Sequence, residues 1–285
     1  MSSPEPTRPH HPQAFYEHGV TPFFACQADE RFSYSLFLPE RAPEERLPVL
    51  VIPHDTLRTP ERYRDAFLAW ATEHRTAIVV PLFAAGIGMP WDLHAYKALD
   101  AFGVRYDDVL LAMLDECAER FGLDIGRFLM FGFSGGAQFA QRFLLVHPDR
   151  LLACSIGAPG AITLLDPDTD WWVGISDVEE RFGRPLRMDA LRAVEVQTIV
   201  GTDDVETWEL EGDVFTEHPL WMPGAGRAGV TRVDRARTLT GMLREAGVTV
   251  EHVEVPGVAH LPHGLLPAVQ AFLARQLENR SRRSR

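Results

Sequence analysis

The feature that most constrains the fold is a serine enclosed by glycines, Gly-Phe-Ser-Gly-Gly at 132–136, which directly follows the apolar run Phe128–Phe131. A Gly-x-Ser-x-Gly segment between a strand and a helix turns the chain so sharply that the serine takes a strained backbone conformation. Gly132 and Gly136 would supply the room for this turn, because a Cβ at either position would crowd the strand against the helix. The residues that follow carry apolar side chains at helical spacing, so the sequence predicts a strand–turn–helix unit with Ser134 at the turn.

Short motifs of glycine and serine also occur by chance in loops, so this segment alone is compatible with an ordinary turn. An acid and a histidine further along the chain argue against chance. The buried strand expected at Val196–Val200 is followed closely by Asp204, and the valine-rich run Val248–Val255 leads to His260. Residues just past the ends of parallel strands meet at one edge of the sheet, so Ser134 and these two side chains are expected to come together.

The chain order of serine, acid and histidine resembles that of the α/β-hydrolase fold superfamily. The resemblance covers residues 30–277, and the segments that carry it are 51–54, 132–136, 201–204 and 257–260. Within the superfamily the chain is most similar to the esterase and polyhydroxybutyrate-depolymerase-like branch. The resemblance implies an α/β fold with a mostly parallel central sheet, helices on both faces and cap-like loop insertions.

The resemblance also implies a Ser-His-Asp triad. A serine hydroxyl is a poor nucleophile at neutral pH and needs an adjacent base. His260 would accept the proton of Ser134 and later pass it to the leaving group, while Asp204 would hold the imidazole in the required tautomer. Asp203 remains an alternative acid, although the usual spacing from the preceding glycine in this superfamily favours Asp204.

Two N–H donors are expected to stabilise the oxyanion of the tetrahedral intermediate. One is the backbone N–H of Gly135, the residue after the nucleophile. The other belongs to the loop after Ile52, where His54, Asp55 and Thr56 stand in place of the superfamily's His-Gly pair. Asp55 and Thr56 are both candidates. A carboxylate that points inward would oppose the oxyanion, so the Asp55 side chain must face away.

Two segments, 158–195 and 208–230, interrupt the alternation of strands and helices. Both follow strands on the side where the triad residues would meet, so we expect them to form a lid or a pocket wall. Phe133, next to the serine, and Trp171 and Trp172, in the first segment, are predicted to contact the substrate. The alternative is that the two tryptophans only pack behind the lid.

Apolar runs and helical patterns otherwise alternate over residues 21–278, which predicts a single domain with a parallel sheet covered on both faces. Residues 1–20 are expected to be a flexible lead-in, and 279–285 a disordered basic tail. The expected strands are Phe23–Cys26, Phe32–Leu38, Val49–Pro53, Ala77–Val80, Phe128–Phe131, Leu151–Ile156, Val196–Val200 and Val248–Val255. Two helices are expected to begin near residues 60 and 107, two more to span Gly135–His147 and Val233–Arg244, and a last helix to end the domain.

Composition narrows the range of partners. A net charge of −12 disfavours nucleic acid and anionic membranes, and no apolar run is long enough to span a bilayer. The cysteines, Cys26, Cys117 and Cys154, are too few and too widely spaced for a disulfide framework, which favours a reducing cytoplasm. No cluster of ligands has metal-binding spacing, and no phosphate loop or dinucleotide fingerprint is present, so neither a metal nor a cofactor is expected.

These patterns together predict a hydrolase that cleaves a small-molecule carboxylic ester through an acyl-serine intermediate. A serine peptidase or thioesterase, a lyase or acyl transferase, and a catalytically silent binding protein on the same fold remain alternatives. The sequence leaves open the acyl and alcohol groups of the substrate and the oligomeric state, a homo-oligomer included.

Overall fold

A nine-stranded sheet runs through the computed structural model, which describes residues 16–42, 44–207 and 217–283. The strand order is β1-β3-β5-β4-β8-β9-β10-β11, with β2 paired to β3. The strands are β1 (Gly19–Val20), β2 (Phe24–Ala25), β3 (Ser33–Leu38), β4 (Pro48–Val51), β5 (Ala77–Leu82), β8 (Asp124–Phe133), β9 (Leu151–Gly157), β10 (Glu195–Gly201) and β11 (Val250–Val255).

The six strands from β5 to β11 pair in parallel, and only β1, β2 and β3 add antiparallel edges. Because parallel neighbours end at the same side, the loops after β4, β8, β10 and β11 emerge together at the carboxyl edge of the sheet. The predicted α/β class with a mostly parallel sheet is therefore confirmed.

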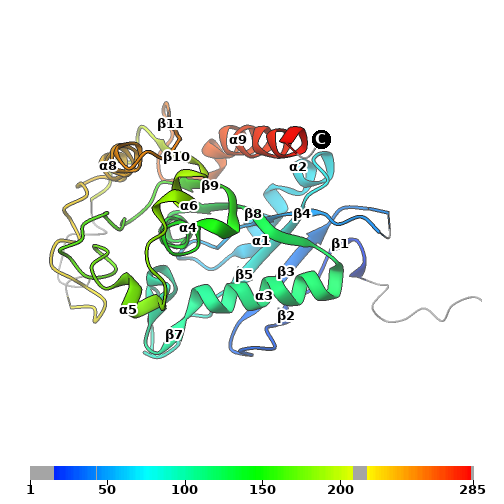
Figure 1. Cartoon of the computed structure of the whole chain (residues 1–285), viewed down its shortest axis with the longest axis horizontal. Helices are drawn as coiled ribbons and strands as arrows, with labels where there is room; N and C mark the ends of the chain where they lie inside the picture. The colour runs from blue at the N-terminus through cyan, green and yellow to red at the C-terminus, as the bar shows by residue number, and fades with distance from the viewer. Residues whose placement is uncertain (1–15, 43, 208–216, 284–285) are drawn as a thin grey trace, which may run out of the picture.

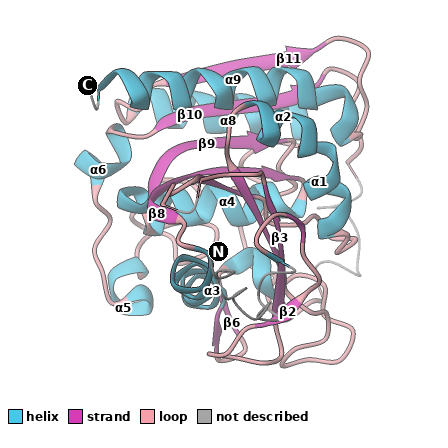
Figure 2. Cartoon of the chain, turned by 90° about the vertical axis from the view of Figure 1, so that its right-hand side faces the viewer, coloured by secondary structure: helices cyan, strands magenta, loops and turns pink. Residues whose placement is uncertain are grey.

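Helices cover both faces of this sheet (Figures 1 and 2). A short antiparallel pair, β6 (Asp100–Ala101) with β7 (Val104–Arg105), and two 3-10 turns, η2 (Ala95–Ala98) and η3 (Pro148–Arg150), lie outside it. The helices are α1 (Pro60–Ala66), α2 (Leu68–Glu73), α3 (Tyr106–Phe121), α4 (Gly135–Val146), α5 (Val178–Phe182), α6 (Met188–Arg192), α8 (Arg232–Glu245) and α9 (Pro262–Arg283).

Strand β4 shows how the core is divided between the two faces. Val49 and Val51 belong to the cluster formed with α3 and α4, whereas Leu50 and Ile52 belong to the cluster formed with α1, α2 and α9. Successive strand residues point to opposite faces, so burial on both sides requires an unbroken apolar run. This is why the central strands could be predicted from their composition.

The two ends of the described chain differ from expectation. Gly19–Val20, within the predicted flexible lead-in, pairs with β3 as β1; residues 1–15 lie outside the described part. The predicted disordered tail is wrong at 279–283, because α9 continues to Arg283. Arg280 pairs with the carboxylate of Asp124, and this contact holds the last turns of the helix against the start of β8.

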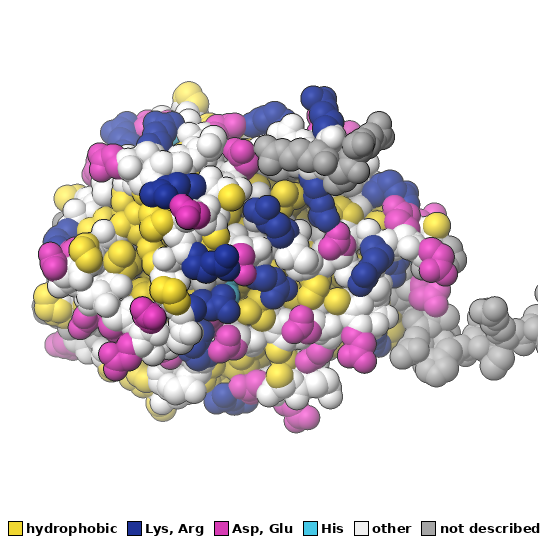
Figure 3. Space-filling view, in the orientation of Figure 1, with side chains coloured by type: hydrophobic (Ala, Val, Ile, Leu, Met, Phe, Trp, Pro, Cys, Tyr) yellow, Lys and Arg dark blue, Asp and Glu magenta, His cyan; other side chains and the backbone are white. Residues whose placement is uncertain are grey.

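The surface of the described residues mixes charges of both signs, as the face in Figure 3 shows. Within the described ranges, no helix combines the length and apolar character that crossing a bilayer requires. The three cysteines are buried free thiols, and Cys117, which belongs to α3, lies in the core cluster.

Candidate active site

Ser134 sits at the turn between β8 and α4 in a conformation that side chains rarely adopt, with φ +54° and ψ −113°. Its N–H donates to the carbonyl of Gly157 over 2.9 Å, which ties the turn to β9. A Cβ on Gly132 would overlap the backbone of Gly136, and a Cβ on Gly136 would overlap the carbonyl of Pro53. Both glycines are therefore required by close approach of backbone to backbone.

The three predicted triad side chains form one connected line at the carboxyl edge of the sheet. Ser134 Oγ lies 3.0 Å from His260 Nε2, and His260 Nδ1 lies 2.7 Å from Asp204 Oδ2. With its proton on Nδ1, His260 donates to the buried carboxylate and accepts from the serine hydroxyl. Asp203 is exposed and its carboxylate accepts from Thr202, so Asp204 is the acid in contact with the histidine.

Asp204 has a second partner that the sequence did not suggest. Its Oδ1 accepts from Arg232 Nη1 at 2.6 Å, and both side chains are almost fully buried. Burial alone would raise the pKa of Asp204, but the hydrogen bond from His260 and the attraction of Arg232 outweigh it and lower the pKa. The acid is therefore held in its charged form beside the imidazole.

The loop after β4 carries Asp55 and Thr56 to the same edge. Both oxygens of the Asp55 carboxylate are engaged, Oδ1 by the N–H of Leu57 at 2.9 Å and Oδ2 by the hydroxyl of Tyr63 at 2.8 Å. A Cβ built on Gly135 would come within 3.0 Å of Thr56 Oγ1, so Thr56 packs directly on the residue after the serine. The structure thus brings all three predicted oxyanion-hole residues around Ser134.

His54 fixes the course of this loop from inside the protein. Its Nε2 accepts the N–H of Phe83 at 3.0 Å, and its Nδ1 donates to the carbonyl of Asp55 at 2.7 Å. Complete burial lowers the pKa of His54 to about 3, so the ring is neutral and can make both bonds. The backbone of Asp55 is therefore anchored from the core.

A cavity of about 560 Å³ opens in front of Ser134. Phe133 lines it and stacks on the His260 ring, with centroids 4.7 Å apart. Both irregular segments contribute to its wall: Gly160, Ala161 and Trp172 come from the first, and His218, Leu220 and Trp221 from the described part of the second. Its size is typical of small-molecule sites.

No protein-family profile and no curated protein sequence matches the chain. Among solved structures it is similar to a poly(aspartic acid) hydrolase from Sphingomonas sp. KT-1, with 20% identity, TM-score 0.66, and coverage of 90% of this chain and 98% of that one. A poly(3-hydroxybutyrate) depolymerase from Bordetella parapertussis has 23% identity, TM-score 0.66, and coverage of 91% and 95%. A ferulic acid esterase has 18% identity and TM-score 0.61, with coverage of 91% of this chain and 99% of that one. The chain has the α/β-hydrolase fold.

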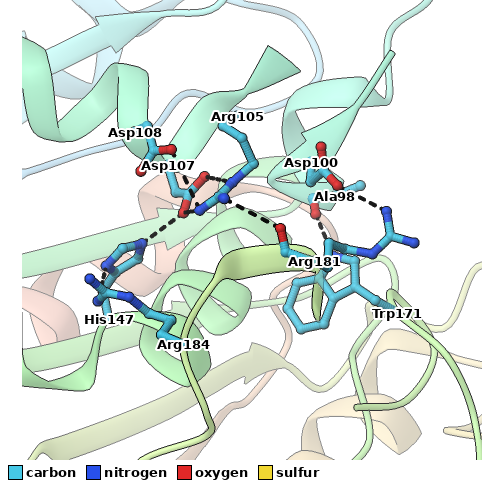
Figure 4. Close-up of polar contacts among 9 residues, drawn as sticks. All are labelled: Ala98, Asp100, Arg105, Asp107, Asp108, His147, Trp171, Arg181 and Arg184. Carbon is cyan, nitrogen blue, oxygen red and sulfur yellow. Dashed lines mark hydrogen bonds and ion pairs between the residues drawn. The ribbon is translucent and has the colours of Figure 1, made fainter. Parts of the chain in front are cut away.

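In this α/β-hydrolase fold the two adjacent tryptophans have different surroundings. Trp172 lines the cavity, but Trp171 is not among the lining residues, so its predicted contact with substrate is wrong. The indole N–H of Trp171 donates to the carbonyl of Ala98 at 2.6 Å (Figure 4), and its ring packs edge-on against Phe182. Adjacent side chains point in different directions, and a buried indole N–H needs an acceptor, which for Trp171 lies outside the cavity.

Among the described residues, one group has ligand atoms close enough together to hold a metal ion, and it consists of Asp107, Asp108 and His147. A guanidinium already lies among them: Arg105 Nη2 is 2.6 Å from Asp107 Oδ2 and 3.6 Å from Asp108 Oδ2 (Figure 4). His147 Nε2 contacts the same Asp107 oxygen at 2.7 Å. This network joins the start of α3 to the end of α4 and serves packing of the α/β-hydrolase core.

Sequence reasoning missed several polar side chains that line the cavity, among them Lys97, Gln138 and Arg142. One signal was available, because Gln138 and Arg142 follow Ser134 at intervals of four and therefore share its side of α4. Lys97 and Arg232 had no such signal, since only the tertiary structure brings η2 and α8 to the serine.

Proposed function

We propose that the chain is a serine hydrolase that cleaves carboxylic esters through an acyl-serine intermediate. The observation that carries this proposal is the continuous contact from Asp204 through His260 to Ser134, with 2.7 Å and 3.0 Å between the bonded atoms. A nucleophile, a base within hydrogen-bond reach and an acid that orients the base are the parts that such catalysis requires.

The reaction proceeds in two half-reactions with the same groups. Ser134 Oγ attacks the ester carbonyl carbon while His260 Nε2 takes the hydroxyl proton. The tetrahedral intermediate collapses, the C–O bond to the alcohol breaks, and the alcohol leaves with the proton from His260. A water then attacks the acyl-serine, with His260 again as base, and releases the carboxylic acid and free Ser134.

Charge on the developing oxyanion is stabilised by two backbone N–H donors, one at the N-terminus of α4 and one in the loop after β4. The N–H of Gly135 is the first donor, since it follows the nucleophile and belongs to the unpaired first turn of the helix. The second donor comes from the loop of Asp55 and Thr56. Hydrogen bonds from Leu57 and Tyr63 fix the orientation of the Asp55 carboxylate and disperse its charge, which limits its repulsion of the oxyanion.

The names of similar structures support an ester as the substrate, since they include a ferulic acid esterase and a poly(3-hydroxybutyrate) depolymerase. The lining of the cavity by Phe133, Trp172 and Leu266 supplies apolar surface for the acyl chain or the alcohol.

The test combines active-site labelling with turnover of p-nitrophenyl esters of graded chain length, beside thioester and peptide substrates. We expect a fluorophosphonate to label the wild type and not Ser134→Ala, and His260→Ala to lower ester kcat/KM by about a thousandfold or more. An unlabelled wild-type protein that is folded and inactive would indicate a binding protein instead. Preference for thioesters or peptides over every ester would reassign the substrate.

A further inference from the structure

Helix α4 presents a line of three side chains to the cavity, which are Ser134 at its start, Gln138 and Arg142. Eight residues of helix correspond to about 12 Å along its axis, and long side chains on a helix lean toward its N-terminus. Arg142 therefore lies about two helical turns further along α4 than Ser134, and both side chains line the same cavity.

Arg142 is buried without a counter-charge among the described residues. Its Nε donates to Thr163 Oγ1 at 3.0 Å, its Nη1 donates to the carbonyl of Lys97 at 2.6 Å, and its guanidinium lies 4.7 Å from the centre of the Trp172 ring. None of the described residues accepts a hydrogen bond from its Nη2. Burial lowers the pKa of Arg142 to about 9, so the group remains positively charged at neutral pH.

Arg232 provides an internal comparison, since it is equally buried and lines the same cavity. That arginine has the carboxylate of Asp204 as partner at 2.6 Å, whereas Arg142 has only neutral groups around it. A buried charged donor without a partner destabilises a folded protein, so such a group is retained where it binds something. The missing partner of Arg142 would be an anion.

The charge of the residues that line the cavity also favours an anionic ligand. Among the described lining residues four are lysine or arginine and one, Asp55, is acidic, although the whole chain has a net charge of −12. The Asp55 carboxylate is already engaged by Leu57 and Tyr63. The carbonyl of Lys97 accepts from Arg142, and the Nζ of Lys97 hydrogen-bonds to His94. Burial lowers the pKa of His94 to about 3, so this histidine is neutral.

We infer that the cavity selects esters that carry a carboxylate several atoms from the scissile carbonyl, and that Arg142 binds this carboxylate through Nη2. The inference rests on the proposed ester hydrolysis and names its substrate class. Nη2 of Arg142 is buried and has no acceptor among the described residues, so it can donate to one carboxylate oxygen. A neutral substrate leaves the buried guanidinium without a partner, which is the condition under which a site discriminates most strongly.

The test compares two p-nitrophenyl esters of six-carbon acids, the adipate monoester and the hexanoate, with spontaneous hydrolysis subtracted. We expect the wild type to have at least tenfold higher kcat/KM for the adipate monoester. In Arg142→Met this ratio should fall to about one, and Arg142→Lys should keep an intermediate preference. Arg237→Met, which removes an exposed arginine of α8 outside the cavity, is the matched control and should keep the wild-type ratio.

Loss of its two protein hydrogen bonds could unfold the Arg142 variants, so a second measurement uses only the wild type. Adipate should inhibit hexanoate hydrolysis competitively with a Ki at least tenfold below that of the neutral diamide, adipamide. Equal turnover of both esters by an active wild type would overturn the inference and leave the proposed function intact. A carboxylate preference that persists in folded Arg142→Met would also overturn it. Absence of any ester turnover or fluorophosphonate labelling would instead refute the proposed function.

Discussion

Ser134 holds its backbone at φ +54°, where a side chain costs about 1 to 3 kcal/mol. Glycine adopts such angles without this cost, although it loses more backbone entropy on folding. We therefore expect Ser134→Gly to be more stable than Ser134→Ala by about 1 kcal/mol, while both lack ester hydrolysis. Urea unfolding of the two inactive variants measures the difference, and equal midpoints would show that the turn stores no strain.

His54 makes the stability of the protein depend on pH. In the unfolded chain its imidazole takes up a proton below about pH 6.5, but in the fold its pKa is lowered to about 3. Between these values only the unfolded state is protonated, so the free energy of unfolding falls as the pH falls, by about 1.4 kcal/mol per unit for this group. Below about pH 3 the dependence ends.

His54→Gln removes this titration while an amide can still accept from Phe83 and donate to the carbonyl of Asp55. Between pH 6 and 4 we expect the free energy of unfolding of this variant to fall less steeply with falling pH than that of the wild type. The difference in slope should be about 1.4 kcal/mol per pH unit, which corresponds to one proton. Urea titrations at several pH values give both slopes. Parallel slopes would mean that His54 is protonated in the fold.

Helix α1 holds the loop of Asp55 and Thr56, which would supply the second donor of the proposed oxyanion hole. Tyr63 in α1 holds Oδ2 of Asp55, and its removal frees a carboxylate beside the site where negative charge develops. We expect Tyr63→Phe to lower kcat about tenfold with little change in KM, because the effect arises in the transition state. Steady-state kinetics on a neutral p-nitrophenyl ester measure both constants.

The double variant Tyr63→Phe/Asp55→Asn separates charge from packing. Asparagine has nearly the shape of aspartate but no charge, so it should restore most of the lost kcat if the freed carboxylate is the cause. Equal rates in the single and double variants would show instead that Tyr63 acts only by supporting the fold, which urea unfolding of both would register.

The strands that lead to Ser134 and Asp204 could be predicted because their sequence signals are local. The run ending at Ser134 and the run Val196–Val200 are buried on both faces, so each is apolar throughout and bounded by turn residues. The single helix expected from residue 60 is divided into α1 and α2 at Phe67, and α5 and α6 were missed because a helix of five residues has too short a periodic pattern to be predicted. The helix expected to begin near residue 60 does begin there, at Pro60.

The side chains that meet at the cavity come from distant parts of the sequence, and only some of them could be predicted. Asp204 and His260 could be predicted because strand ends meet at one edge of a parallel sheet. Arg232 and Lys97 reach the site through α8 and η2, whose positions depend on the packed core rather than on any local pattern. The same holds for Trp171, since a sequence pattern does not say which of two adjacent indoles will face a cavity.

Two electrostatic effects of the protein oppose each other for an anionic ester. The net charge of −12 repels the substrate at long range, while Arg142 attracts it inside the cavity. Salt screens the first effect far more than the second, because the Debye length shrinks from about 30 Å at 0.01 M to about 8 Å at 0.15 M and buried pairs are little affected.

We therefore expect the ratio of kcat/KM for the adipate monoester over the hexanoate to rise about two- to fivefold when NaCl is increased from 10 to 150 mM. The hexanoate itself should be nearly insensitive and serves as the internal control. A carboxylate bound by an exposed lining residue such as Arg62 would give the opposite result, a ratio that falls with salt, since that contact is open to solvent. The sign of the salt effect thus distinguishes a buried from an exposed partner for the same substrate group.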